Sequence, residues 1–103
     1  MDNDLIIKQV IGTDKIIHEP ARIVLLAILN AADQVDFTFL LNETGLSQGN
    51  LSSHLSKLET AGYISIEKTF HKKRPRTLIS MNEKGESAFN DYLQTMREFY
   101  DTL

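Results

Sequence analysis

The sequence predicts a mainly α-helical fold that carries one small β-hairpin. Apolar residues recur at helical spacing in residues 47–61 and again in residues 83–103, a pattern typical of amphipathic helices. Between these segments, residues 63–68 alternate in polarity and residues 77–81 are mostly apolar, which predicts two short strands. A chain of 103 residues has the usual length of one domain, so we assign residues 1–103 to a single unit.

Two helices are expected in the N-terminal third of the chain. Residues 5–11 form a short apolar segment, and residues 13–18 form a connector. Pro20 suits the first turn of the second helix, because the N–H that proline lacks has no helical partner there. The following residues 21–32 are apolar on all sides, so we expect this helix to be buried on most faces. Its only cation, Arg22, is interpreted as solvated or salt-bridged, with a phosphate contact as the alternative.

A third short helix is expected after a polar loop at residues 33–36. It covers about residues 37–44, and the side chain of Asp36 or Thr38 is suited to accept from its free N-terminal N–H groups. Gly45 permits the left-handed backbone conformation that commonly ends a helix. Together with the helix that follows, this arrangement predicts a helix-turn-helix over about residues 37–61.

The fourth helix, capped by Ser47, has two unlike faces. Leu51, Leu55 and Leu58 repeat at helical spacing, so their side is expected to face a core. The other side carries short hydrogen-bonding groups and one cation, which suits the recognition of base edges in the major groove of duplex DNA. The residues expected to contact DNA are Ser47, Gln48, Gly49, Asn50, Ser52, Ser53, His54 and Lys57.

Two of these residues have two interpretations each. Gly49 either lets a DNA phosphate approach the N-terminus of the helix or simply tolerates the turn geometry. His54 either contacts a base or phosphate or forms a hydrogen bond within the domain.

The hairpin, or wing, is expected over about residues 63–81 and is basic. Residues 68–77 contain five Lys and Arg and no acid, which leaves six of the 11 basic residues against all 14 acidic ones elsewhere. The net charge of −3 therefore does not exclude a polyanionic partner, because screening limits attraction to roughly 10 Å at moderate salt. Pro75 cannot donate to a strand ladder and is expected at the tip or at a strand edge. The cations expected to contact phosphate are Lys72, Lys73, Arg74 and Arg76.

The last helix is predicted to begin at its cap Asn82 and to run toward Leu103, with Gly85 in its first turn for close packing. About 20 residues give a helix of roughly 30 Å, which is longer than a small core covers. We therefore expect a homodimer that uses residues 4–18 and 83–103. The expected interface residues are Leu5, Ile6, Val10, Phe89, Tyr92, Leu93, Met96, Phe99, Tyr100 and Leu103.

Several classes of site are excluded by the residues themselves. The chain has no cysteine, and His18, His54 and His71 are not spaced as a metal-binding set, so neither a metal nor another cofactor is expected. No nucleophile has a base and acid placed to activate it, so we do not expect an enzyme. No apolar run approaches the roughly 18 residues that span a bilayer, and residues 1–4 lack the basic start of a signal peptide. We expect a cytoplasmic protein with no membrane partner.

The chain resembles the short, one-domain winged-helix transcriptional regulators of bacteria and archaea, and most closely a MarR/ArsR-like group. The resemblance covers about residues 15–90 and is carried chiefly by Gly49-Asn50-Leu51-Ser52-Ser53-His54-Leu55 and Arg74-Pro75-Arg76-Thr77. It implies a homodimeric transcription factor that places the helix after Gly45 in the major groove of double-stranded DNA and the wing beside or in the minor groove. Two-fold symmetry would then require a pseudo-palindromic operator.

The resemblance has two departures, and one alternative function remains. ArsR-type metal sensors use cysteine or clustered His and acids, and MarR proteins have longer flanking helices around a ligand pocket, so no small-molecule effector is assigned. The alternative is a winged helix that serves protein–protein contact without binding DNA. Five wing cations without an acid among them favour DNA.

Overall fold

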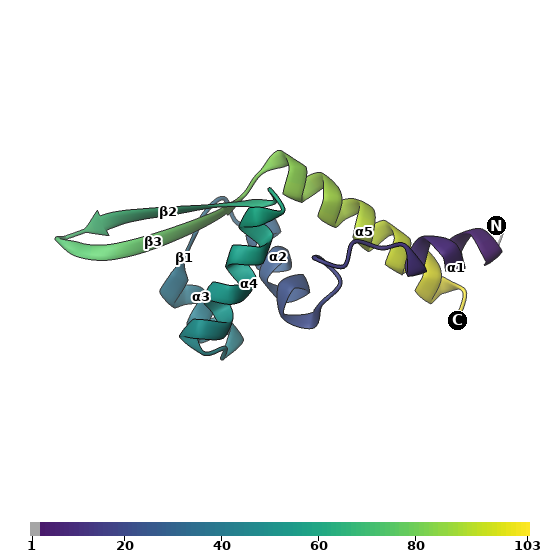
Figure 1. Cartoon of the computed structure of the whole chain (residues 1–103), viewed down its shortest axis with the longest axis horizontal. Helices are drawn as coiled ribbons and strands as arrows, with labels where there is room; N and C mark the ends of the chain where they lie inside the picture. Colours follow the sequence, from purple (N-terminus) through teal and green to yellow (C-terminus); the bar gives the residue numbers. More distant parts are fainter. Residues whose placement is uncertain (1–2) are drawn as a thin grey trace.

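The computed structural model describes residues 3–103 and confirms a mainly α-helical fold with a β-hairpin wing (Figure 1). Met1 and Asp2, two of the four residues used above to argue against a signal peptide, lie outside the described residues. Along the chain the elements are α1 (Asn3–Ile11), α2 (Pro20–Ala31), β1 (Val35–Asp36), α3 (Phe37–Thr44), α4 (Gln48–Thr60), β2 (Ile64–His71), β3 (Arg74–Met81) and α5 (Glu83–Asp101).

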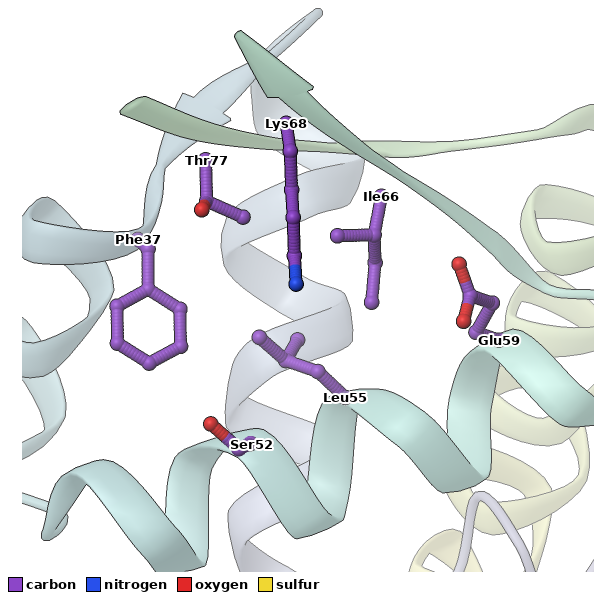
Figure 2. Close-up of a pocket in the computed structure, with 7 residues that line it drawn as sticks. All are labelled: Phe37, Ser52, Leu55, Glu59, Ile66, Lys68 and Thr77. Carbon is purple, nitrogen blue, oxygen red and sulfur yellow. The ribbon is translucent and has the colours of Figure 1, made fainter. Parts of the chain in front are cut away.

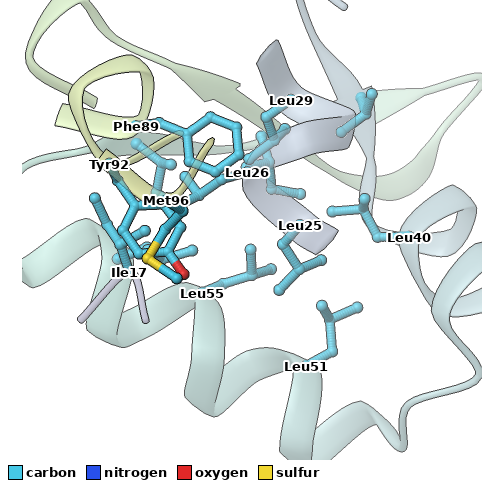
Figure 3. Packing of buried hydrophobic residues seen from close by; sticks show 14 residues of the cluster. Ile17, Leu25, Leu26, Leu29, Leu40, Leu51, Leu55, Phe89, Tyr92 and Met96 are labelled. Atoms are coloured by element: carbon cyan, nitrogen blue, oxygen red, sulfur yellow. The ribbon is translucent and has the colours of Figure 1, made fainter. Parts of the chain in front are cut away.

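The hydrophobic core lies between α2, α3, α4, the base of the wing and α5 (Figure 3). Leucines of α2, α3 and α4 meet there, and Phe89 from α5 closes one side. Helix α2 is covered on most faces, as expected: Leu25, Leu26 and Leu29 are buried and Ile23 and Ile28 are half-buried. Val24, which is 49% exposed, and Ala27 are three residues apart and lie on one exposed stripe. The elements that contact α2 are α3, α4 and β3, and its buried leucines share the core with Phe89 of α5.

In the part of the chain that the structure describes, four helix starts are capped by side chains that accept hydrogen bonds from free backbone N–H groups. The predicted caps Ser47 and Asn82 are confirmed, and of the two candidates for α3, Asp36 and Thr38, the cap is Asp36. Glu19 caps α2, and its carboxylate accepts from the N–H of the second residue of that helix at 2.8 Å. The turn between α3 and α4 depends on Gly45, whose φ of 69° is the left-handed conformation expected for it.

The wing is part of a three-stranded antiparallel sheet with the order β1-β3-β2. The polar loop predicted at residues 33–36 is wrong at Val35 and Asp36, which pair with Ile79 and Leu78 of β3. Two residues are too few to show the alternation that reveals a strand, so β1 exists only because β3 lies beside it.

The two wing strands are also longer than predicted, since their pairing continues through the basic stretch to His71 and Arg74. Lys72 and Lys73 form a two-residue turn in which both have positive φ, 52° and 68°. Such a turn matches the twist of the strands but is usually made by Asn-Gly, so the sequence carried no turn signal here. Pro75 lies beyond the part of β3 that pairs with β1, as expected for a strand edge.

The ends of the chain form an arm opposite the wing. Helix α1 packs along the C-terminal half of α5, and the molecule measures 57 × 25 × 21 Å (Figure 1). Gly85 allows the start of α5 to approach β2 closely, because a Cβ at this position would overlap the carbonyl oxygen of Tyr63. Among residues 3–103, no helix is both long and apolar enough to cross a membrane.

Candidate nucleic-acid interface

Helix α4 presents the polar face that the sequence predicted. Leu51, Leu55 and Leu58 are at most 2% exposed, which anchors one side of α4 in the core. The opposite side, which we call the recognition face, is therefore turned to solvent. Most residues expected to contact DNA are exposed here, namely Ser47, Gln48, Gly49, Asn50, Ser52, Ser53 and Lys57.

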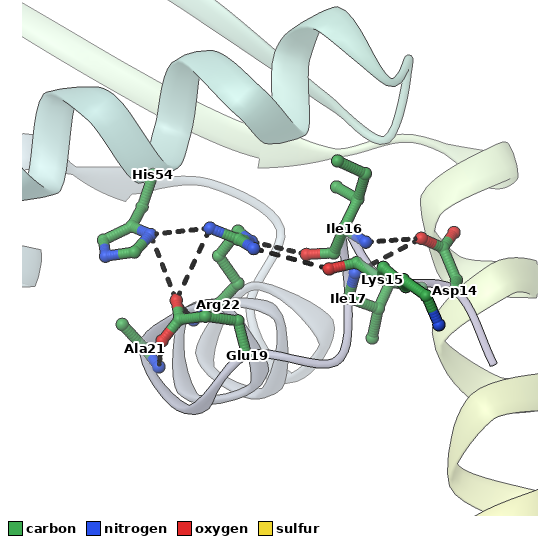
Figure 4. Close-up of polar contacts among 8 residues, drawn as sticks. All are labelled: Asp14, Lys15, Ile16, Ile17, Glu19, Ala21, Arg22 and His54. Carbon is green, nitrogen blue, oxygen red and sulfur yellow. Dashed lines mark hydrogen bonds and ion pairs between the residues drawn. The ribbon is translucent and has the colours of Figure 1, made fainter. Parts of the chain in front are cut away.

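His54 differs from its neighbours because it takes part in a network inside the domain (Figure 4). Its Nδ1 lies 3.0 Å from Nη1 of Arg22 and 3.1 Å from Oε2 of Glu19. The second interpretation of His54, a hydrogen bond within the domain, is therefore the one that the structure supports, and Nδ1 is not available to DNA.

Arg22 is the centre of the same network. It is 8% exposed, its Nη1 lies 3.5 Å from the carboxylate of Glu19, and its Nε donates to the carbonyl oxygen of Ile16. The salt-bridged interpretation of Arg22 is confirmed, and a phosphate contact is excluded by this burial. Burial tends to raise the pKa of Glu19, but the N–H of Ala21 and the charges of His54 and Arg22 lower it overall.

The wing cations are not equivalent. Lys72, Lys73 and Arg74 are exposed around the tip. Arg76 instead donates through Nε to Oδ2 of Asp36 at 2.9 Å. This is the ion pair that the structure shows for a wing cation within residues 3–103. Residues 68–77 contain no acid, and this partner of Arg76 lies 40 residues away along the chain, so the pair could not be read from the sequence of the wing. The N–H of Thr38 and the guanidinium of Arg76 lower the pKa of Asp36.

A groove of about 610 Å³ separates α4 from the wing (Figure 2). The side chain of Lys68 points from β2 into this groove, toward α4. Ser52 lines it from the recognition helix and Thr77 from β3. Glu59 of α4 also lines the groove, and its floor is apolar, with Phe37, Leu55 and Ile66. Lys68 is the cation of this lining, so it joins the candidate interface. The sequence counted Lys68 among the basic residues of the wing but did not place it beside α4.

The ten residues expected at a dimer interface divide into three groups. Leu5, Tyr100 and Leu103 are exposed, and Val10, Leu93 and Phe99 are half-buried. The other four are covered by the chain itself, because α1 and the core pack on them: Ile6, Phe89, Tyr92 and Met96. A repeating apolar stripe along a long helix does not distinguish contact with its own domain from contact with a partner.

No group of three or more metal-binding side chains is found in the part of the chain that the structure describes. His18 has a structural role instead, since its Nδ1 lies 2.7 Å from the hydroxyl of the buried Tyr92. His71 pairs with Arg74 at the tip of the wing.

An exposed polar helix beside a basic hairpin, joined by a tight turn to a preceding helix, is the geometry of a winged helix. The family model described as a winged helix DNA-binding domain matches residues 21–100. The chain belongs to this family. Membership of the winged-helix family confirms the predicted resemblance and the expectation that the chain is not an enzyme.

Relatives of this winged-helix chain occur in archaea. "Uncharacterized protein MJ0432" of Methanocaldococcus jannaschii is 35% identical over 79 residues, which cover 77% of this chain and 86% of that protein. The structure of a transcriptional regulator homologue protein from Pyrococcus horikoshii OT3 is similar with a TM-score of 0.87 and 24% identity. The match covers 94% of this chain and 95% of that one. The crystal structure of MarR is similar with a TM-score of 0.75 and 18% identity, over 95% of this chain and 69% of that one. At these identities the two structures show a shared fold.

Proposed function

We propose that this winged-helix protein is a homodimeric, sequence-specific transcriptional regulator that binds double-stranded DNA. The observation that carries the proposal is the shared groove, because it brings the recognition face of α4 and the basic wing to one side of the molecule. A DNA duplex that places α4 in its major groove meets the wing cations along the adjacent backbone.

The two parts of this surface have different tasks in the proposal. Gln48 and Asn50 extend from the first turn of α4, where amide groups form paired hydrogen bonds with base edges. Lys68, Lys72, Lys73 and Arg74 hold phosphates and so determine affinity without distinguishing sequences. The helix then supplies specificity, and the wing supplies the salt-dependent part of binding.

The homodimer is proposed from the exposed apolar side chains of the arm. These terminal apolar side chains are Leu5, Ile7 and Ile11 of α1 and Tyr100 and Leu103 near the end of α5, and each is at least 47% exposed. Burying such a group against a second copy stabilises the pair by removing apolar surface from water. A two-fold dimer presents two α4 helices, so the proposed operator is pseudo-palindromic.

The proposal is tested by fluorescence anisotropy against a pool of genomic fragments, titrated from low to high salt. We expect steeply salt-dependent binding that selects pseudo-palindromic fragments. In the same assay, Gln48→Ala and Asn50→Ala should each lower the ratio of specific to non-specific binding, which corresponds to a loss of roughly 1–3 kcal/mol of discrimination. Asn30→Ala, which removes an exposed amide of α2 outside the recognition face, the wing and the arm, is the control and should keep the ratio of the unaltered protein.

Two results would contradict the proposal in different ways. An unchanged ratio in both α4 variants would show that these amides do not recognise bases. A dimer that binds every fragment weakly and without selection would instead favour the alternative function, a winged helix that contacts another protein.

A further inference from the structure

Phe70 is an aromatic side chain without a structural role in the wing. It is 74% exposed, more than any other aromatic residue that the structure describes. It lies one residue before the end of β2, and the next residues are His71, Lys72 and Lys73. An isolated hairpin tip has no core to bury a phenyl ring, so burial within this chain does not explain it.

The strand register gives Phe70 a neighbour and a direction. Phe70 pairs with Pro75 across the hairpin, and paired residues of an antiparallel ladder project from the same face. The pairs Lys68 with Thr77 and Ile66 with Ile79 follow on that face toward the base of the wing. Ile66, Lys68 and Thr77 line the groove beside α4, so Phe70 and Pro75 continue the wall of the candidate DNA interface outward to the tip.

The charges around this apolar pair identify the kind of partner. Lys72, Lys73 and Arg74 form the turn and the start of β3, and all three are exposed. An apolar group ringed by cations is complementary to a surface that is apolar inside and anionic at its rim. Duplex DNA has this character in its minor groove, where stacked base edges lie between two rows of phosphates.

We propose that Phe70, supported by Pro75, is an apolar wedge that enters the minor groove and partly unstacks one base step. This inference rests on the proposed DNA-binding function and adds a residue and a mode of recognition to it. Inserted apolar side chains bend duplexes toward the major groove, and flexible pyrimidine–purine steps bend at the lowest cost. The wing therefore contributes sequence preference through the deformability of the step that it enters, beyond the phosphate contacts of its cations.

The test uses a duplex of roughly 20–30 bp, selected from a random-sequence pool by binding to the unaltered protein. Donor and acceptor dyes at the two ends report bending, and 2-aminopurine placed at successive steps reports unstacking by its fluorescence. The variants are Phe70→Ala and Phe70→Leu, which keeps an apolar wedge. Val24→Ala is the control, because it shortens another exposed apolar side chain that lies on α2 and not on the wing. Because Phe70 is mostly exposed, its replacement should leave the fold intact, as circular dichroism can verify.

We expect the unaltered protein, Phe70→Leu and Val24→Ala to shorten the distance between the dyes and to brighten 2-aminopurine at one step. Phe70→Ala should lose both signals and bind about tenfold more weakly. Its salt dependence should not change, because a phenyl ring makes no phosphate contact.

The outcomes separate the wedge from the proposed function. If the unaltered protein binds without bending, or if Phe70→Ala bends the duplex equally, the wedge is wrong and the regulator stands. If no duplex is retained from the pool, both proposals fail. If Phe70→Ala changes only the sedimentation of the free protein, the ring contacts a second copy, and the wedge is wrong.

Discussion

Arg76 of the wing donates from Nε to Oδ2 of Asp36, the residue that caps α3, at 2.9 Å. One carboxylate therefore accepts from the helix N-terminus and from the wing at the same time. This links the orientation of the hairpin to the helix-turn-helix, and it neutralises part of the charge that Arg76 would otherwise offer to DNA.

Arg74 and Arg76 should consequently behave differently when each is replaced by alanine. Arg74→Ala should lower the slope of log affinity against log salt by about one, since an exposed cation loses one phosphate contact. Arg76→Ala should change that slope less and should lower the melting temperature slightly, because its pair with Asp36 is partly exposed and contributes at most about 1 kcal/mol. Anisotropy titrations at several salt concentrations and thermal unfolding measure both effects. Equal slopes for the two variants would contradict the difference.

Replacing the two lysines at the tip of the wing should stabilise the fold and weaken DNA binding. Lys72 and Lys73 both have positive φ, a conformation that costs L residues roughly 1–2 kcal/mol each. Replacing them together, Lys72→Asn with Lys73→Gly, should raise the free energy of unfolding by up to about 2 kcal/mol, because this pair favours the turn. The same protein should lose about two units of salt slope. Urea unfolding measures the change in stability, and anisotropy at several salt concentrations measures the change in slope. A stabilised variant with an unchanged slope would show that neither lysine contacts DNA.

Two glycines allow a paired test of packing and function. Gly85→Ala places a Cβ against the carbonyl oxygen of Tyr63, so it should destabilise the protein by about 1–3 kcal/mol. Gly49→Ala meets nothing within 4 Å and should stabilise α4 by roughly 0.5–1 kcal/mol. If DNA approaches the helix closely at Gly49, this more stable variant will bind more weakly. Unchanged affinity would show that Gly49 has no part in DNA contact.

The hydroxyl of Tyr63 donates to Asp14, and this hydrogen bond, with burial, raises its pKa from 10.0 to about 12. A raised pKa means that the folded state favours the protonated phenol. The resulting stabilisation is complete below pH 10 and is lost as the pH rises through about 12. Urea unfolding across this range should show a steeper loss in the unaltered protein than in Tyr63→Phe. Parallel curves would show that this contact does not contribute to stability.

The exposed end of α5 provides the test of the dimer. Tyr100 is one of the terminal apolar side chains and is 59% exposed. Tyr100→Glu should therefore yield monomers in sedimentation without unfolding the chain. Val24→Glu alters a similarly exposed apolar residue on α2 and should leave the dimer intact. A dimer that persists in the first variant and dissociates in the second would place the interface on α2.

The elements defined by local pattern could be predicted from the sequence. Helix α4 has leucines at helical spacing and a serine before its first turn, and both features act within a few residues of chain. Its recognition face follows from the same spacing. The basic character of the wing is likewise a property of ten consecutive residues.

The candidate site needed more than local pattern. His54 and Ser52 are both polar residues of α4, yet His54 meets Arg22 whereas Ser52 lines the groove. The sequence left Phe70 in the loop between the two predicted strands, whereas the structure places it in β2, beyond the core and opposite Pro75.

By itself, then, the sequence determined which segments are helical, where α3, α4 and α5 begin, and which surfaces are polar or basic. Only the tertiary structure decided that β1 joins the sheet, that Arg76 is paired with Asp36, and that Phe89 is buried by its own chain. The physical reason is distance along the chain. Periodicity and capping depend on neighbours within one or two turns, whereas burial and ion pairing depend on residues that only folding brings together.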